Sequence, residues 1–317
     1  MPVSTRAAAV EAPAAAERPK PFFEVLPAPE ASRMINSWRG FVEEHRIRGY
    51  EAGPDQHTTM PSIANIVQEV ASNHAVAMWG RSEEGFATDP MLADKGLIFV
   101  MTRLQIQMDA YPKWGQVMMV ETWFQASGKI GAQRDFLFRC KESGKILGRA
   151  TSTWVMINLH TRKLQKMPDE VREKCFWYAE EAPARQAIAP VYTKQKIPEV
   201  ALPAEIVGPA QVARRSDVDM NGHINNVTYL CWGLETVPPE VYKACHLYQV
   251  EIDFKAECHC GDLVESLAQR SVPPEALASN GAGPQSLAFV HTLRRCDGDK
   301  CTELVRMRTI WRAGEAP

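Results

Sequence analysis

The chain has 317 residues, a length that predicts one or two domains with a large hydrophobic core. Its formal net charge of −2 at pH 7 gives no overall signal for binding nucleic acid or an anionic membrane. No run of about 18 apolar residues occurs, so we expect no transmembrane segment. Composition therefore favours an ordinary globular protein in which only a local basic patch could attract an acidic partner.

The eight cysteines are scattered along the chain. A chain of this length can fold around its core without disulfides. The sequence therefore favours a reducing compartment.

The N-terminal segment, residues 1–35, differs in composition from the rest of the chain. It begins MPVSTRAAAVEAPAAAERPKP, which is rich in Ala and Pro and has no apolar periodicity, so we expect disorder. A secretory signal needs an apolar core, and this segment lacks one. The remnant of an organelle transit peptide fits better, although Glu11 and Glu17 are unusual in such peptides, and an inert tail stays open.

Residues 36–167 predict a first compact unit. A strand-like run at 41–53 precedes a long helix that has Pro61 near its start, where the missing N–H costs nothing. Apolar residues then recur at helical spacing. Four strand-like runs separated by turns follow, at 96–110, 115–128, 132–143 and 146–159.

The same order of elements recurs after a polar, Pro-rich connector at 168–204. Residues 205–317 predict a strand at 210–219, a helix at 224–237 and four further strands. They lie at 248–258, 262–272, 286–296 and 301–313. One long helix wrapped by an antiparallel sheet, present twice, describes an α+β fold of the double hotdog type.

Small polar residues are concentrated just before the second predicted helix, in DVDMNGHINN at 217–226. An N-cap would use one of them, with Ser216, Asp217 or Asp219 as candidates. The surplus, above all Asn221 and His223, favours a reaction centre. A helix N-terminus stabilises a developing oxyanion, an amide can donate to it, and His can move a proton near neutral pH.

This segment also carries a resemblance to a known family. DVDMNGHINNVTYLCWGLETVP at 217–238 resembles the catalytic segment of the plant and algal acyl–acyl carrier protein thioesterases, which reads D-x-D-x-N-Q-H-x-N-N-V-x-Y. The resemblance extends from about Phe41 to Trp311. Other similar segments are IANIVQEVASNHA, YPKWGQVMMVETW, GKIGAQRDF, GRATSTWVMINLHTRKLQKMPDEVR and IDFKAEC.

The resemblance implies a double hotdog that hydrolyses the thioester between a fatty acyl chain and acyl carrier protein, which ends chain elongation in plastids. The IANIVQEV helix and the NNVTY segment are closer to the oleoyl-preferring class. It further implies localisation in the chloroplast stroma, acyl carrier protein as partner, no cofactor and a homodimer.

The family's catalytic set falls on Asp219, Asn221, His223, Glu257 and Cys258 in this chain. Two mechanisms are open. The Cys258 thiolate could attack the thioester, or Glu257 with His223 could activate a water molecule. We favour water, because Glu257 supplies a base that needs no covalent step, and a buried Cys is often inert packing.

The sequence departs from the family pattern at two places. Gly222 stands where the family has Gln, which loosens the expected geometry of Asn221 and His223. Cys258, His259 and Cys260 suggest a metal, but adjacent strand residues point to opposite faces and no second ligand pair has zinc-site spacing. We therefore expect no metal.

The resemblance places the acyl chain in the first unit, residues 36–167, and catalysis in the second, residues 205–317. Residues on or near the first helix would then line an acyl tunnel, namely Met60, Ile63, Ile66, Val67 and Trp79. They could equally be ordinary core residues.

A basic stretch follows the first unit and includes Arg162, Lys163 and Lys166. It predicts a docking surface for the acidic carrier protein, with a plain solvated face as the alternative.

Three other functions stay open. An acyl-CoA thioesterase of the same fold differs only in the leaving group. A hotdog dehydratase would need a His and a carboxylate but neither Asn221 nor Glu257, and a non-catalytic acyl-binding module would not need His223.

Overall fold

The computed structural model describes residues 32–35, 40–79, 92, 94–170, 172, 185–274 and 286–314. The predicted tail lies outside the described residues except for its end. There β1 (Arg33–Ile35) pairs antiparallel with β2. None of the described helices is long and apolar enough to cross a membrane.

The first repeat has the predicted order of one helix followed by four antiparallel strands. Its elements are β2 (Gly40–Arg46), the short 3-10 helix η1 (Gly49–Glu51), α1 (Met60–Trp79), β3 (Leu97–Met108), β4 (Val117–Ser127), β5 (Gly131–Cys140) and β6 (Ile146–Asn158). The helix spans 20 residues and starts with Pro61 in its first turn, as the sequence predicts.

The second repeat follows α4 (Pro190–Thr193) and has the same order with shorter pieces. Its elements are β7 (Ile206–Val207), β8 (Gln211–Val212), η2 (Arg215–Asp217), α5 (Asn226–Leu234), α6 (Pro239–Ala244), β9 (Cys245–Phe254), β10 (Leu263–Ser271), β11 (Leu287–Asp297) and β12 (Lys300–Ala313).

Two expectations for the second repeat were wrong. The predicted strand at 210–219 is only the two-residue β8, followed by the 3-10 helix η2. The predicted long helix is the nine-residue α5, after which Pro238 and Pro239 begin α6. Proline cannot donate an N–H to the preceding turn, so this pair ends the helix.

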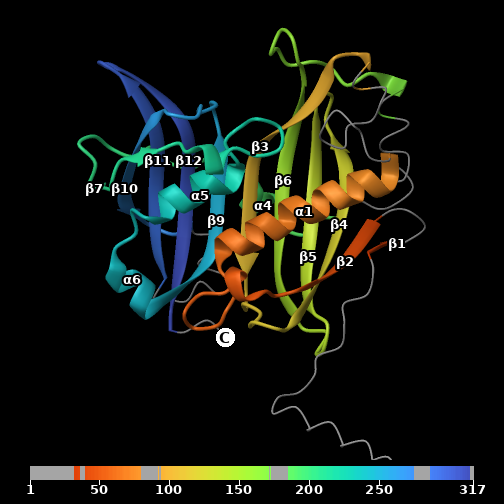
Figure 1. Ribbon diagram of the computed structural model, residues 1–317, viewed down its shortest axis with the longest axis horizontal. Coiled ribbons are helices and arrows are strands. Elements are labelled where there is room, and N and C mark those ends of the chain that lie inside the picture. Colours follow the sequence, from red (N-terminus) through yellow and green to blue (C-terminus); the bar gives the residue numbers. More distant parts are fainter. Residues whose placement is uncertain are drawn as a thin grey trace, which may run out of the picture.

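The two repeats join edge to edge in one sheet. The strand order is β1-β2-β4-β5-β6-β3-β9-β12-β11-β10-β7, with β8 also paired to β10. The two halves of the sheet have the same strand order when each is followed outward from the central β3–β9 pair. In each repeat the first strand after the helix lies at the centre. Figure 1 shows α1 and α5 on the same side of this sheet. The predicted double hotdog arrangement is confirmed.

The core lies between the helices and the sheet. Ile63, Ile66, Val67 and Val70 recur at helical spacing and bury one face of α1. They belong to a single cluster of buried residues that also contains Val227, Leu230 and Cys258 of the second repeat. The two repeats therefore share one core, and α1 contacts α5 within it.

The opposite face of the central strands is polar and buried. Arg103 on β3 donates to Asp253 at 2.8 Å and lies 3.6 Å from Glu251, both on β9. Its guanidinium also donates to the carbonyl of Gln195 in the connector. Arg308 on β12 pairs with the fully buried Glu251 from the other side. The connector is thus tied to the junction between the repeats.

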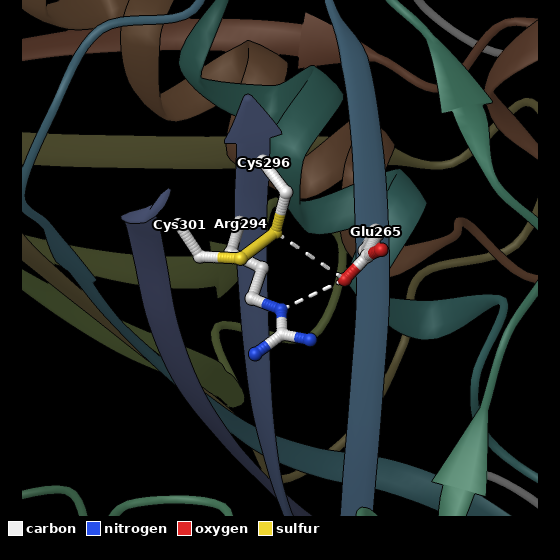
Figure 2. Close-up of a disulfide and its surroundings, with 4 residues drawn as sticks. All are labelled: Glu265, Arg294, Cys296 and Cys301. Atoms are coloured by element: carbon white, nitrogen blue, oxygen red, sulfur yellow. Dashed lines mark hydrogen bonds and ion pairs between the residues drawn. A yellow bond between two sulfur atoms is a disulfide. The ribbon is translucent and has the colours of Figure 1, made fainter. Parts of the chain in front are cut away.

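One disulfide joins Cys296 and Cys301, which lie directly opposite each other on β11 and β12 (Figure 2). Their Cα atoms are 4.1 Å apart. Nearby, Arg294 donates to Glu265 at 2.8 Å. This pair differs from the expectation of reduced cysteines, because spacing along the chain does not reveal that a hairpin places two side chains face to face.

Candidate active site

The polar segment before α5 forms a tight loop closed by a bridge between Val218 and Ile224. The N-cap of α5 is Asn225, whose side-chain oxygen accepts the N–H of Val227 at 2.9 Å. The sequence-based candidates for this cap, Ser216, Asp217 and Asp219, were therefore wrong, since η2 and the loop intervene before the helix begins.

Asp219 holds this loop together. Its Oδ1 accepts the backbone N–H of Asn221 at 2.8 Å and that of His223 at 3.3 Å. Its own N–H donates to the carbonyl of His223 at 2.8 Å. Gly222 takes the turn with φ of +79°, a conformation that glycine adopts without steric cost. The exposed side chains of Asn221 and His223 therefore stand on a fixed backbone.

Tyr229 connects α5 to the second part of the predicted set. It lies one turn into the helix, is 4% exposed, and its hydroxyl accepts the N–H of Cys258 at 3.1 Å. Its ring contacts those of Trp232 and Phe254 edge-to-face. The segment that follows β9 thus returns beside the start of α5.

Cys258 is only 2% exposed. Burial, together with the negative charge of Asp262, raises the pKa of its thiol to about 12. Its Sγ lies 3.7 Å from the carbonyl oxygen of His259. The thiol is therefore protonated near neutral pH and shielded by its neighbours.

Glu257 points away from this buried position and is about half exposed. Its carboxylate forms an ion pair with Arg162, from the turn after β6 of the first repeat. The structure thus brings the two segments of the predicted set together through Tyr229, and no hydrogen bond among the described residues joins Glu257 to Asn221 or His223.

Sequence reasoning missed the residues that fix the loop at 257–262. Asp262 accepts the N–H of His259 at 2.8 Å and a guanidinium hydrogen bond from Arg295 at 2.6 Å. The role of Tyr229 was also missed. Its place in the motif gave a signal, but an aromatic residue in a helix is usually core, and here it is both core and acceptor.

The predicted acyl-binding residues lie in the shared core. Met60, Ile63, Ile66 and Val67 are each at most 5% exposed. The side chain of Trp79 lies outside the described residues. Lys163 and Lys166 are exposed, whereas Arg162 is engaged with Glu257. Within the described ranges no group of three His, Cys, Asp or Glu side chains could hold a metal ion.

Two family models match consecutive parts of the chain. Residues 39–175 match the acyl-ACP thioesterase N-terminal domain, and residues 209–313 match the acyl-ACP thioesterase C-terminal domain, where ACP is acyl carrier protein. The boundaries coincide with the two structural repeats.

Among curated proteins, the chain is 38% identical to "Oleoyl-acyl carrier protein thioesterase 1, chloroplastic" of Arabidopsis thaliana, over 86% of this chain and 76% of that protein. It is 38% identical to "Palmitoyl-acyl carrier protein thioesterase, chloroplastic" of Gossypium hirsutum, over 90% and 66%.

Solved structures include a similar 12:0-ACP thioesterase from Umbellularia californica. The match has a TM-score of 0.75 at 31% identity and covers 87% of this chain and 94% of that one. A putative oleoyl thioesterase from Lactobacillus plantarum shares the fold, with a TM-score of 0.68 at 22% identity, over 86% and 96%. The chain belongs to the acyl-ACP thioesterase family, and it is an enzyme that hydrolyses the thioester of acyl-ACP to release the free fatty acid.

Proposed function

We propose that the enzyme hydrolyses the thioester by direct attack of water, with His223 and Glu257 as the proton-accepting groups. Water loses a proton to this pair and attacks the carbonyl carbon, the C–S bond breaks, and the carrier thiolate leaves and takes up a proton. Asn221 and the positive N-terminal end of the α5 dipole stabilise the oxyanion. Asp219 holds the loop in shape.

The state of Cys258 is the observation that carries this proposal. A nucleophilic cysteine needs a lowered pKa and access to the substrate. Cys258 has neither property, since burial raises the pKa of its thiol to about 12 and its side chain is covered. No hydrogen bond in the described part of the chain joins its sulfur to His223.

Hydrolysis of acyl-ACP by His223→Ala and Cys258→Ser tests the mechanism. We expect His223→Ala to lose at least about 100-fold in kcat, the usual range for a general acid–base group. Cys258→Ser should keep most activity, because Ser fills nearly the same volume. An acyl-enzyme trapped in a rapid quench, together with loss of activity in Cys258→Ser, would establish the covalent route instead.

We also propose that Lys163 and Lys166 form a docking surface for the carrier protein. Both are exposed cations at the end of the first repeat, on the same segment as Arg162, which contacts Glu257. Acidic partners are steered by such charge. The double variant Lys163→Glu/Lys166→Glu should raise KM for acyl-ACP and leave KM for acyl-CoA unchanged.

The matched control for this docking test is Lys194→Glu/Lys196→Glu, two exposed lysines of the connector. Equal effects of the two double variants would reject a local docking surface. A parent enzyme that prefers acyl-CoA over acyl-ACP would favour the alternative leaving group.

The cellular setting and the acyl preference are further proposals. The curated relatives above are named chloroplastic, which supports a plastid location. An oleoyl preference is supported by the resemblance of the motifs, whereas oleoyl and palmitoyl enzymes are equally identical to the chain. Hydrolysis of a panel of acyl-ACP substrates measures the acyl preference. Import assays test the plastid location, and light scattering tests whether the chain forms a homodimer.

A further inference from the structure

The ion pair between Arg162 and Glu257 joins the first repeat to the catalytic segment of the second. The partners are 95 residues apart in sequence, and their side chains are 47% and 46% exposed. Glu257 directly precedes Cys258, which is fixed to α5 through Tyr229. The first repeat therefore supplies a side chain to the active-site region.

The turn that carries Arg162 is tightly built. The side-chain oxygen of Asn158 accepts the N–H groups of His160 and Thr161, at 3.1 and 2.8 Å. Its backbone N–H donates to the carbonyl of Lys163, and its carbonyl accepts the N–H of Arg162. These bonds hold the backbone of Arg162 at φ of +58°, in the left-handed region.

That conformation is uncommon for any residue except glycine, and it persists only where the surrounding structure enforces it. Residues held in this way cluster at functional sites. Here the enforced turn directs a long side chain across to the other repeat. A turn that served only to reverse the chain could use glycine or asparagine at this position.

Glu257 needs such an external partner. The backbone around it is fixed by the contact of Cys258 with Tyr229 and by the contact of His259 with Asp262. Among the described residues, however, Arg162 makes the sole hydrogen bond to its carboxylate. A half-exposed glutamate otherwise samples several rotamers. The hydrogen bond from the guanidinium selects one of them.

We propose that Arg162 is a positioning residue that holds the Glu257 carboxylate ready to accept a proton from water. This inference rests on the proposed role of Glu257 as a base. Arg162 itself exchanges no proton, since its guanidinium stays charged. The active site is accordingly completed by both repeats, and the turn at 158–163 belongs to it.

Steady-state kinetics on one acyl-ACP substrate test this role with Arg162→Ala, Arg162→Lys, Glu257→Gln and the double variant Arg162→Ala/Glu257→Gln. Arg162→Ala should lower kcat about tenfold with KM unchanged, because a misplaced group is costly even at small displacement. Arg162→Lys should recover part of the loss. The double variant should be no slower than Glu257→Gln, since Arg162 acts through Glu257.

Arg149→Ala is the matched control. Arg149 lies on β6, the strand that leads to this turn, and pairs with Asp109 at 3.0 Å with similar exposure. It should change neither kcat nor KM. Thermal unfolding of each variant checks that the fold is retained.

Four outcomes would overturn the inference. A raised KM with unchanged kcat in Arg162→Ala would make Arg162 a docking residue. Losses that multiply in the double variant would mean that Arg162 acts independently of Glu257. Full activity of Glu257→Gln would show that Glu257 is not the base, and it would reject the positioning role of Arg162 as well. Impaired activity of Glu257→Gln together with full activity of Arg162→Ala would reject only the positioning role.

Discussion

Asp219 lies in the predicted catalytic set, yet its carboxylate faces the backbone of its own loop. One oxygen accepts the N–H groups of Asn221 and His223. The Asp219 carboxylate therefore fixes the backbone of both residues of the predicted set, because it accepts the N–H group bonded to the Cα of each. The geometry supports a positioning role for this carboxylate, distinct from proton transfer.

Substitutions at Asp219 separate these roles. Asp219→Asn keeps an oxygen that can accept both N–H groups, so kcat should fall less than about tenfold. Asp219→Ala removes the acceptor, and the resulting displacement of His223 should cost about 100-fold in kcat. Steady-state kinetics on acyl-ACP provide the measurement. Equal losses in both variants would show that the negative charge itself is required.

Gly222 shows how a departure from the family pattern fits the loop. Its φ is +79°, and no atom lies within 4 Å of the position that a Cβ would occupy. A Cβ at this position would therefore meet no atom beyond its chain neighbours among the described residues, and the backbone conformation is what opposes a side chain. Glycine adopts this conformation without steric cost, so the loop keeps the hydrogen bonds made by Asp219.

At the scale of elements, α1 and α5 differ in length and in the polarity of their surroundings. The 20 residues of α1 cover the sheet of the first repeat, and its buried face has no polar group between Met60 and Val70. The nine-residue α5 is short and carries the polar loop at its N-terminus. The long apolar helix suits an acyl chain, and the short capped helix suits the reacting carbonyl.

The proposal that α1 lines the acyl tunnel predicts the effect of Met60→Trp. Met60 opens the helix and is 3% exposed within the core shared by both repeats. A larger side chain there should shorten the acyl chain that is accepted. Gas chromatography of the released fatty acids measures this shift.

Val76→Trp, on the exposed side of α1, is the control and should leave the product profile unchanged. Overpacking at Met60 should also cost about 1–3 kcal/mol in stability, so Met60→Phe is a milder second variant. An unaltered profile in both Met60 variants would rule out a tunnel wall at this position.

At the scale of the whole molecule, the junction between the repeats combines an apolar and a charged layer. The helices and the inner face of the sheet share one hydrophobic core. On the opposite face, burial raises the pKa of Glu251, and the charges of Arg308 and Arg103 oppose this effect. Because Arg103 also binds the connector, the relative position of the repeats depends on this cation.

Removing Arg103 should therefore destabilise the whole molecule. Arg103→Ala leaves the carboxylates of Glu251 and Asp253 undercompensated, at a cost of about 3 kcal/mol in the free energy of unfolding. Lys255→Ala, which breaks a more exposed pair with Glu303, should cost less than about 1 kcal/mol. Urea denaturation compares the two variants, and similar losses would show that the junction is held by the apolar core alone.

Much of this arrangement could be predicted from the sequence. Periodicity predicts α1 and the long strands of both repeats, because the burial of each side chain is encoded by its local spacing. The order of elements predicts the duplication, and the motif DVDMNGHINN predicts the polar loop before α5. The sequence alone therefore determined the architecture, and it predicts the residues of the reaction centre.

Only the tertiary structure decided how those residues are held in space. The sequence does not indicate which partner a polar side chain contacts. Examples are the cap at Asn225, the link from Tyr229 to Cys258, and the pair between Arg162 and Glu257. The same holds for the disulfide between Cys296 and Cys301. Such contacts depend on burial, rotamer and the approach of distant strands, which arise only when the chain has folded.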